Sequence, residues 1–296
     1  MVGDRKNILI FGGTGYLGKQ LVKMLNNDYD PIIVTRQKSL MDIDGYLYWD
    51  YKDMAIANQV PEVFAVINLT GAGIAEKNWT KKRKEELYNS RILPAKSIVK
   101  LVNSRQKKPA KFVQGSAIGF YKINEHKIID ETGHRGQGFL SELVYDWEKS
   151  VSGIDQEIQL SVIRTGLVVG NGSPLIKRMR LPFSFFMGGR IGTGNQIMSW
   201  IHIKDWCRII HYILDNDLEG VFNATAPNPV SNKTFSKALG KSLNRPAWFP
   251  LPGFILKFVL GEMAESTVLA GQNVIPARIL DHGFVFDYEC ILGALE

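Results

Sequence analysis

The chain has 296 residues, of which 45% are hydrophobic and 22% are charged, as in an ordinary globular protein. This length provides for one large domain, or for a large and a small one. Cys207 and Cys290 are too few and too far apart to indicate a disulfide framework or a metal site. No apolar run reaches the roughly 18 residues of a membrane span, and the first residues lead directly into a strand, which leaves no signal peptide. We expect a cytoplasmic protein with no membrane partner.

The formal net charge of +7 raises the question of a nucleic-acid partner. The basic residues are dispersed along the sequence, except for the run 81–84, which is followed by two glutamates in an expected helix. A solvated helix face accounts for that run. Because no concentrated basic face or known motif accompanies the charge, we expect no nucleic-acid partner. A small anionic ligand fits the charge equally well.

The first predicted elements are an apolar strand over 7–11, a glycine-rich turn and a helix with apolar residues at helical spacing through 25. Glycine has no Cβ atom, so such a turn can be tight and its N–H groups can approach a pyrophosphate. The helix N-terminus adds a partial positive charge. The alternative is a glycine-rich turn of another α/β fold. We expect a nucleotide to bind through Gly12, Gly13, Thr14, Gly15, Tyr16, Leu17 and Gly18.

The second strand, over 32–34, is followed by Thr35 and Arg36. Proteins of this type that prefer NAD usually have an acidic residue at the end of this strand, for the ribose hydroxyls. No acidic residue occurs here, and the planar guanidinium of Arg36 can meet a 2′-phosphate instead. The pattern therefore favours NADP over NAD, the alternative being that Arg36 is a solvated surface residue.

A third buried strand spans 63–69, and a long helix follows from about residue 80 to Asn103. The carboxyl ends of parallel strands line the ligand crevice of an open sheet. We therefore expect Asn68, Leu69, Thr70 and Gly71 to run alongside the cofactor.

Candidate acid–base groups follow in the next strand and helix. The strand from Lys111 ends near Ser116, whose hydroxyl can bind a substrate oxygen; the alternative is that Ser116 is only a turn residue. The helix over 139–149 carries Tyr145 and Lys149 four residues apart on one face. Such a pair can transfer a proton, because the ammonium lowers the pKa of the phenol.

A further strand is expected over 158–169, and up to this point strands and helices alternate, which predicts a parallel sheet with helices on both faces. From residue 173 the chain is rich in proline and phenylalanine, which suits a mobile, apolar-lined substrate cover. A short strand over 198–203 and helices over 205–214, 234–243 and 253–269 follow. His202 and Asp205 read as structural residues, with Asp205 complementing a helix dipole. We expect a nucleotide-binding domain over 1–172, rejoined by 195–226, and a smaller lobe from 173–194 and 227–296.

The chain resembles the extended short-chain dehydrogenases/reductases, which include nucleotide-sugar epimerases and dehydratases, and more closely the atypical branch labelled epimerase family. The matching stretches cover essentially the whole chain and include 11–15, 67–71, 79–80, 116–121, 188–192, 199–202 and 223–227. The resemblance implies a Rossmann-type doubly wound parallel sheet with a smaller, mostly helical C-terminal substrate lobe. It also implies an NAD(P) cofactor and a nucleotide-sugar or other small anionic substrate, and it is compatible with a homodimer.

The sequence departs from the catalytic members of this group in the helix over 139–149. In those members an acidic residue stands four positions after the active-site lysine. If Glu148 is that residue, Val144 takes the lysine position and Leu140 the tyrosine position, and neither can transfer a proton. Tyr145 and Lys149 then lie five residues farther along, about 140° around the helix. Either the helix register has slipped and Tyr145 serves, or the usual pair is lost; we favour loss, which is described for this branch.

Arg91 stands near the position at which the catalytic members usually carry an asparagine. Its charge can bind an anionic substrate group, or replace the lost lysine near the cofactor. The alternative is a structural ion pair beneath the sheet.

Two functions follow from this sequence. One is an NADP-dependent enzyme of the epimerase/dehydratase type, with Ser116 orienting the substrate oxygen and Tyr145 carrying the proton. The other is a sensor or interaction protein without chemistry, in which bound NADP orders the segment 173–197.

Overall fold

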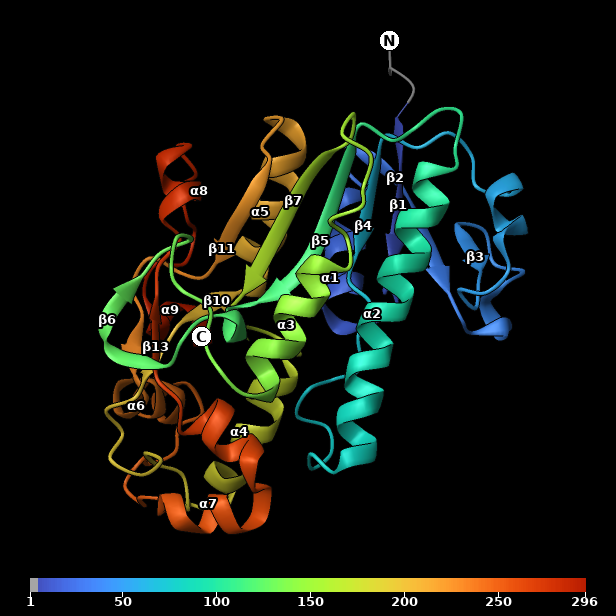
Figure 1. Ribbon diagram of the computed structural model, residues 1–296. Coiled ribbons are helices and arrows are strands. Elements are labelled where there is room, and N and C mark those ends of the chain that lie inside the picture. The colour runs from blue at the N-terminus through green and yellow to red at the C-terminus, as the bar shows by residue number, and fades with distance from the viewer. Residues whose placement is uncertain (1–4) are drawn as a thin grey trace.

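The computed structural model describes residues 5–296, apart from the side chains of 124–126; residues 1–4 of the expected first domain lie outside the described residues. Seven parallel strands form one sheet in the order β11-β7-β5-β4-β1-β2-β3 (Figure 1). They are β1 (Lys6–Phe11), β2 (Tyr29–Thr35), β3 (Tyr46–Tyr48), β4 (Ala65–Asn68), β5 (Lys111–Ala117), β7 (Gln159–Thr165) and β11 (Gly220–Ala224). The expected doubly wound parallel sheet is confirmed.

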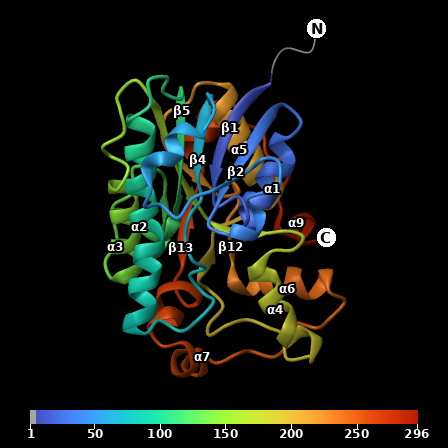
Figure 2. The same cartoon turned by 90° about the vertical axis from the view of Figure 1, so that its right-hand side faces the viewer.

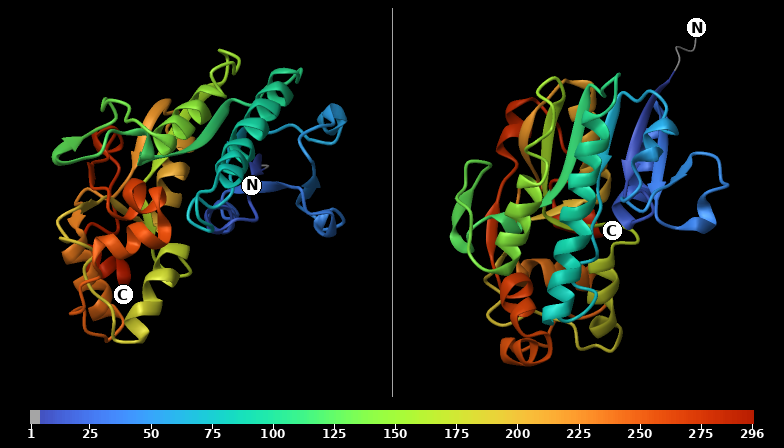
Figure 3. Two further views of the ribbon diagram at one scale, coloured as in Figure 1. Left: turned by 60° about the horizontal axis from the view of Figure 1, so that its bottom comes forward. Right: turned by 45° about the vertical axis from the view of Figure 1, so that its right-hand side comes forward.

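Helices cover both faces of the sheet (Figures 1 and 3). α1 (Tyr16–Leu25) and α5 (Ile203–Asp215) pack on one face, and α2 (Lys81–Asn103) and α3 (Phe139–Lys149) on the other. Strand β1 is apolar because both of its faces are buried. Ile8 and Ile10 pack in the core beneath α1 and α5, whereas Leu9 and Phe11 pack in the core beneath α2 and α3. Strands buried on both faces read as continuous apolar runs.

The prediction of a single strand over 158–169 is wrong. The chain divides at Gly166 into β7 and β8 (Leu167–Val169), and β8 leaves the sheet to pair with β10 (Trp200–His202). A Cβ atom at Gly166 would lie 2.6 Å from the backbone oxygen of Ser199. The glycine therefore permits the close approach at which the chain turns out of the sheet.

The smaller lobe lies beyond the carboxyl ends of the strands (Figure 2). Its core contains Phe183, Trp200, Phe235, Leu239 and Ile291. Its elements are α4 (Pro174–Ser184), β9 (Ile197–Met198), β12 (Val230–Ser231), α6 (Asn232–Ser242), α7 (Gly253–Leu260) and α9 (Ile291–Leu295). The start of the expected cover segment is thus a regular helix, α4, whose N-terminus is capped by the hydroxyl of Ser173.

The last part of the chain returns to the sheet. β13 (Gln272–Val274) pairs with β6 (Asn124–Ile129), and α8 (Ala277–Asp281) follows. Ile279, Phe284 and Phe286 pack in the core beside α5. The helix expected over 253–269 ends instead at Leu260, because Gly261 has a φ of +55°. Short helical turns lie at Lys38–Leu40, Met54–Asn58, Ile118–Phe120 and Ala264–Val268.

The expected domain boundaries remain predictions. They place 277–286 in the smaller lobe, whereas Ile279, Phe284 and Phe286 of this segment pack in the core beside α5. Within residues 5–296, no helix is long and apolar enough to cross a membrane.

Candidate functional site

The glycine turn after β1 is built by close backbone approach. Gly12 has a φ of +81°, and a Cβ atom there would lie 2.6 Å from the backbone oxygen of Leu69. A Cβ atom at Gly18 would lie 2.4 Å from the backbone oxygen of Gly12. Gly13 lies against Ile33. Gly15 occupies the N-cap position of α1, and because glycine has no side chain, none accepts a hydrogen bond from the first N–H groups of the helix. The first N–H groups of α1 are therefore left for an anion.

Tyr16 ties this turn to the segment that follows β8. Its hydroxyl donates a hydrogen bond to the backbone oxygen of Asn171 at 2.9 Å. Burial raises the pKa of Tyr16 to about 12, so the phenol stays neutral and can donate. Leu17 packs against the core, and Thr14 is half-buried in the turn. The turn is thus held from both the sheet and the lobe side.

Arg36 lies immediately after β2, where the sequence analysis placed a contact with a 2′-phosphate. Its side chain is exposed, and no carboxylate of the described residues pairs with it. Thr35 is buried, and its hydroxyl accepts a hydrogen bond from the N–H of Gln37 at 3.1 Å. Thr35 therefore shapes the turn, whereas the guanidinium of Arg36 is free for an anion.

A buried amide network fixes the carboxyl end of β4. The Asn68 side-chain oxygen accepts hydrogen bonds from the N–H and hydroxyl of Thr70, at 3.1 and 2.7 Å, and the Asn68 amide donates to Gln114 at 2.9 Å. Leu69 and Gly71 follow in the same turn. Sequence reasoning missed Gln114, because its partner lies 46 residues away and no local pattern marks the pair.

The guanidinium of Arg91 lies beside Gly71, which can carry no larger side chain without a shift: a Cβ atom there would be 3.0 Å from Arg91 Cζ. Arg91 donates to the backbone oxygens of Leu87 and Ala72 at 3.1 and 3.0 Å and lies over the ring of Trp147. Burial lowers the pKa of Arg91 to about 10, so it remains a cation at neutral pH. The alternative for Arg91, a structural ion pair, is not observed, because no carboxylate of the described residues lies within 4 Å of its guanidinium.

Ser116, at the carboxyl end of β5, is engaged within the protein. Its hydroxyl donates a 2.6 Å hydrogen bond to Glu148 Oε1, and both carboxylate oxygens of Glu148 also accept from Arg164 at 2.8 Å. Arg164 in turn lies 3.5 Å from the ring centre of Phe120. Sequence reasoning chose Ser116 and Glu148 separately but missed their contact and missed Arg164.

The face of α3 that meets the sheet carries Leu140, Val144 and Glu148. Val144 is buried, and the Leu140 side chain packs on Gly119, where a Cβ atom would be 2.8 Å from it. Tyr145 and Lys149 are both exposed, and the Arg135 guanidinium lies 4.2 Å from the Tyr145 ring centre. Tyr145 and Lys149 thus lie on a different face of α3 from the one that holds Ser116.

His202 and Asp205 serve the fold. Buried Asp205 accepts hydrogen bonds from the N–H groups of Asp287 and Tyr288 at 3.0 and 2.9 Å, which anchors the returning C-terminal segment. His202 accepts from the N–H of Lys204 and stacks on Tyr288. Both residues make contacts within the fold, as their structural interpretation predicts.

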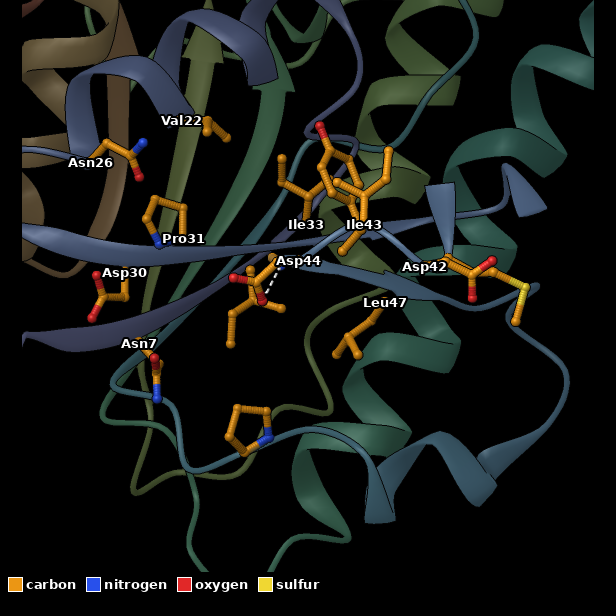
Figure 4. Close-up of a pocket in the computed structure, with 15 residues that line it drawn as sticks. Asn7, Val22, Asn26, Asp30, Pro31, Ile33, Asp42, Ile43, Asp44 and Leu47 are labelled. Atoms are coloured by element: carbon orange, nitrogen blue, oxygen red, sulfur yellow. Dashed lines mark hydrogen bonds between the residues drawn. The ribbon is translucent and has the colours of Figure 1, made fainter. Parts of the chain in front are cut away.

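A separate hollow of about 930 Å³ lies beside β2 and β3 (Figure 4). It is lined by residues from the start of β1 and β2 and the end of α1, among them Asn7, Asn26 and Asp30. Its lining also includes Ile33, whose side chain lies against Gly13 of the glycine turn. In the described part of the chain, no group of three or more His, Cys, Asp or Glu residues can hold a metal ion.

Comparison with known proteins agrees with this geometry. Residues 8–224 match the NAD dependent epimerase/dehydratase family, and residues 251–296 match a domain of unknown function, DUF1731. The chain is 35% identical to the chloroplastic epimerase family protein SDR39U1 homolog of Arabidopsis thaliana, over 99% of this chain and 86% of that protein. It is 33% identical to the epimerase family protein YfhF of Bacillus subtilis, over 98% and 97%.

The solved structure of human epimerase family protein SDR39U1 (isoform 2) with NADPH superposes on this chain with a TM-score of 0.90. The two are 30% identical, over 98% of this chain and 97% of the human one.

Proposed function

The chain belongs to the NAD dependent epimerase/dehydratase family, and we propose that it binds NADP at the glycine turn and acts on a small anionic molecule such as a nucleotide-sugar. The observation that carries the proposal is the glycine turn itself. Gly12 and Gly18 leave no room for a Cβ atom, and the uncapped N-terminus of α1 faces the same turn. A pyrophosphate fits such a cradle. NADPH is the cofactor named for the human relative.

In this proposal, each remaining site residue has a defined part. Arg36 receives the adenosine 2′-phosphate, which gives the preference for NADP over NAD. The turn from Asn68 to Gly71 runs along the cofactor. Arg91, a half-buried cation with no carboxylate partner among the ion pairs of the described residues, holds an anionic group in the crevice. The nicotinamide supplies or accepts a hydride.

The proton carrier is where this chain differs from the catalytic members. While its hydroxyl donates to Glu148, Ser116 can accept a hydrogen bond from a substrate hydroxyl, but it can donate to a substrate carbonyl only if it leaves Glu148. Tyr145 serves only if α3 turns, because its exposed ring now lies under Arg135. Leu140, which packs on Gly119, and buried Val144 cannot transfer a proton. These placements support a second candidate, a sensor that binds NADP without chemistry.

Mass spectrometry of small molecules released by denaturing the freshly purified protein tests the proposal. NADP together with a sugar nucleotide or another anionic metabolite supports the enzyme. NADP alone moves the weight to the sensor, and absence of any nucleotide contradicts both.

Once a substrate is identified, Tyr145→Phe separates the two alternatives for the proton. If α3 turns, turnover is lost while NADP binding is retained; unchanged turnover removes Tyr145 from the mechanism. Lys149→Met is the matched variant for the second member of the pair.

A further inference from the structure

The free end of the smaller lobe exposes an unusual amount of apolar surface. Phe258, Trp248 and Phe254 are 91, 86 and 73% exposed. Exposed apolar residues of this patch, which we call the lobe tip, are Leu181, Phe185, Phe186, Met187, Trp248, Phe249, Phe254, Ile255, Phe258 and Val259. None of the eight residues of α7 is buried, although all but Gly253 and Lys257 are large and apolar. A helix of that composition is normally covered.

The segments of the lobe tip are neighbours in space. The N–H of Phe249 donates to the backbone oxygen of Gly188 at 3.1 Å, and the Arg245 guanidinium lies 5.0 Å from the ring centre of Phe186. The segment then continues from Phe249 into α7. Helix α7 forms the end of the molecule farthest from the sheet (Figures 1 and 2). The apolar side chains therefore project from a free end.

The segments that carry the lobe tip contain basic residues and no acidic ones. Segments 173–204 and 227–261 contain no Asp or Glu and ten basic residues: Lys177, Arg178, Arg180, Arg190, Lys204, Lys233, Lys237, Lys241, Arg245 and Lys257. Acidic residues return directly after the second segment: Glu265 pairs with Lys257 at 2.8 Å, and Glu262 pairs with Lys84. The basic surplus of the two segments therefore lies mainly on α4, on α6 and in the loop that holds Arg245, and not on α7 itself.

We propose that the lobe tip docks on the surface of a lipid membrane that carries anionic headgroups. Exposed Phe and Trp side chains enter the boundary between headgroups and acyl chains, while Lys and Arg around them meet the anionic lipid phosphates. This is contact with one face of a bilayer, and it requires no spanning helix. It is independent of the proposed cofactor.

Charge and side-chain type argue for this occupant over two others. In a symmetric pair of lobe tips, the basic side chains of α4 and α6 on one copy would face those of the other, which costs free energy. A nucleic acid would satisfy the charge and stack on the aromatic rings, but it offers no apolar partner for Leu181, Met187 or Val259.

Sedimentation with vesicles tests the proposal. The full chain is mixed with vesicles of phosphatidylcholine alone or of phosphatidylcholine with phosphatidylglycerol. We expect binding only to vesicles with phosphatidylglycerol, weakened by high salt. The Trp fluorescence should shift to the blue on binding, because Trp248 is the most exposed tryptophan in the described chain. The Trp248→Phe variant keeps the apolar surface and should still sediment, but without the shift.

Two pairs of variants define the surface. Phe254→Ser/Phe258→Ser should lower the vesicle partition coefficient at least about tenfold, whereas Met41→Ser/Ile43→Ser, at exposed apolar positions beside the hollow of Figure 4, should not. Lys237→Glu/Lys241→Glu should weaken binding, and Lys96→Glu/Lys100→Glu on α2 should not. Circular dichroism verifies that each variant is folded.

Several outcomes would overturn the proposal. Failure to sediment with phosphatidylglycerol, or equal binding to both kinds of vesicle, excludes an anionic membrane surface. A dimer in sedimentation velocity that Phe254→Ser/Phe258→Ser dissolves would assign the lobe tip to a second copy. Binding of single-stranded RNA that the same variant removes, without vesicle binding, would assign it to nucleic acid.

Discussion

The start of α1, after β1, and the helix α3, after β5 and β6, differ in how side chains fill the space beside the sheet. At the start of α1, four glycines keep side chains out of the turn, and no side chain caps the helix. On α3, side chains fill the corresponding space: Leu140 packs on Gly119, and Glu148 binds both Ser116 and Arg164. The start of α1 leaves backbone N–H groups without a side-chain partner, whereas on α3 Glu148 pairs with Ser116 and Arg164 inside the protein. The region that we propose binds the cofactor is thus separate from the helix that carries the candidate residues for proton transfer.

We expect the largest effect from a substitution that places a side chain in the glycine turn. Gly12→Val places a branched side chain where a Cβ atom already lies 2.6 Å from a backbone oxygen, at a φ of +81°. We expect NADPH binding to disappear in a titration, and the unfolding free energy to fall by about 1–3 kcal/mol from backbone strain alone. Gly293→Ala is the control, because a Cβ atom there meets nothing within 4 Å. NADPH binding by Gly12→Val would contradict the cradle.

We expect the ion pair between Glu148 and Arg164 to hold α3 against the sheet. Glu148→Ala leaves Arg164 buried without its carboxylate, which we expect to cost about 3–5 kcal/mol in urea unfolding. Glu62→Ala removes the partner of Lys107 in an exposed pair and should change little. If both variants unfold alike, Glu148 does not hold α3 against the sheet.

Cofactor choice sharpens the account of the glycine turn. Arg36→Gln removes the fork of donors and should weaken NADPH about 10–100-fold while leaving NADH almost unchanged. Lys52→Gln, also exposed and basic, is the matched control. Equal weakening of both nucleotides would place Arg36 outside the 2′-phosphate site.

The smallest effect concerns pH and the segment behind the site. Burial lowers the pKa of His202 from 6.5 to about 4. Between these pH values the unfolded chain binds more protons than the folded one. The contribution of His202 to the free energy of unfolding is therefore fully present above about pH 6.5 and is lost as the pH falls toward 4. His202→Asn keeps an acceptor for the N–H of Lys204 and should flatten this part of the urea-unfolding profile. An unchanged slope would show that other groups cause it.

Local features were predictable from the sequence, and long-range contacts were not. The spacing of Gly12, Gly15 and Gly18 between a strand and a helix predicts the turn, because the physical requirement lies within about ten residues. The bond from Ser116 to Glu148 joins residues 32 positions apart, and no periodicity reports it. A single glycine, Gly166, divides an apolar run that otherwise reads as one strand. The exposed apolar residues of α7 look like a core helix until the fold shows them uncovered.

We propose that the glycine turn and Arg36 together select NADP over NAD. The most direct measurement is calorimetric titration of nucleotide-free protein with NADPH and, separately, with NADH. The account predicts that NADPH binds at least about tenfold more tightly, through the extra phosphate. Equal affinity for the two, or binding of neither, would contradict it.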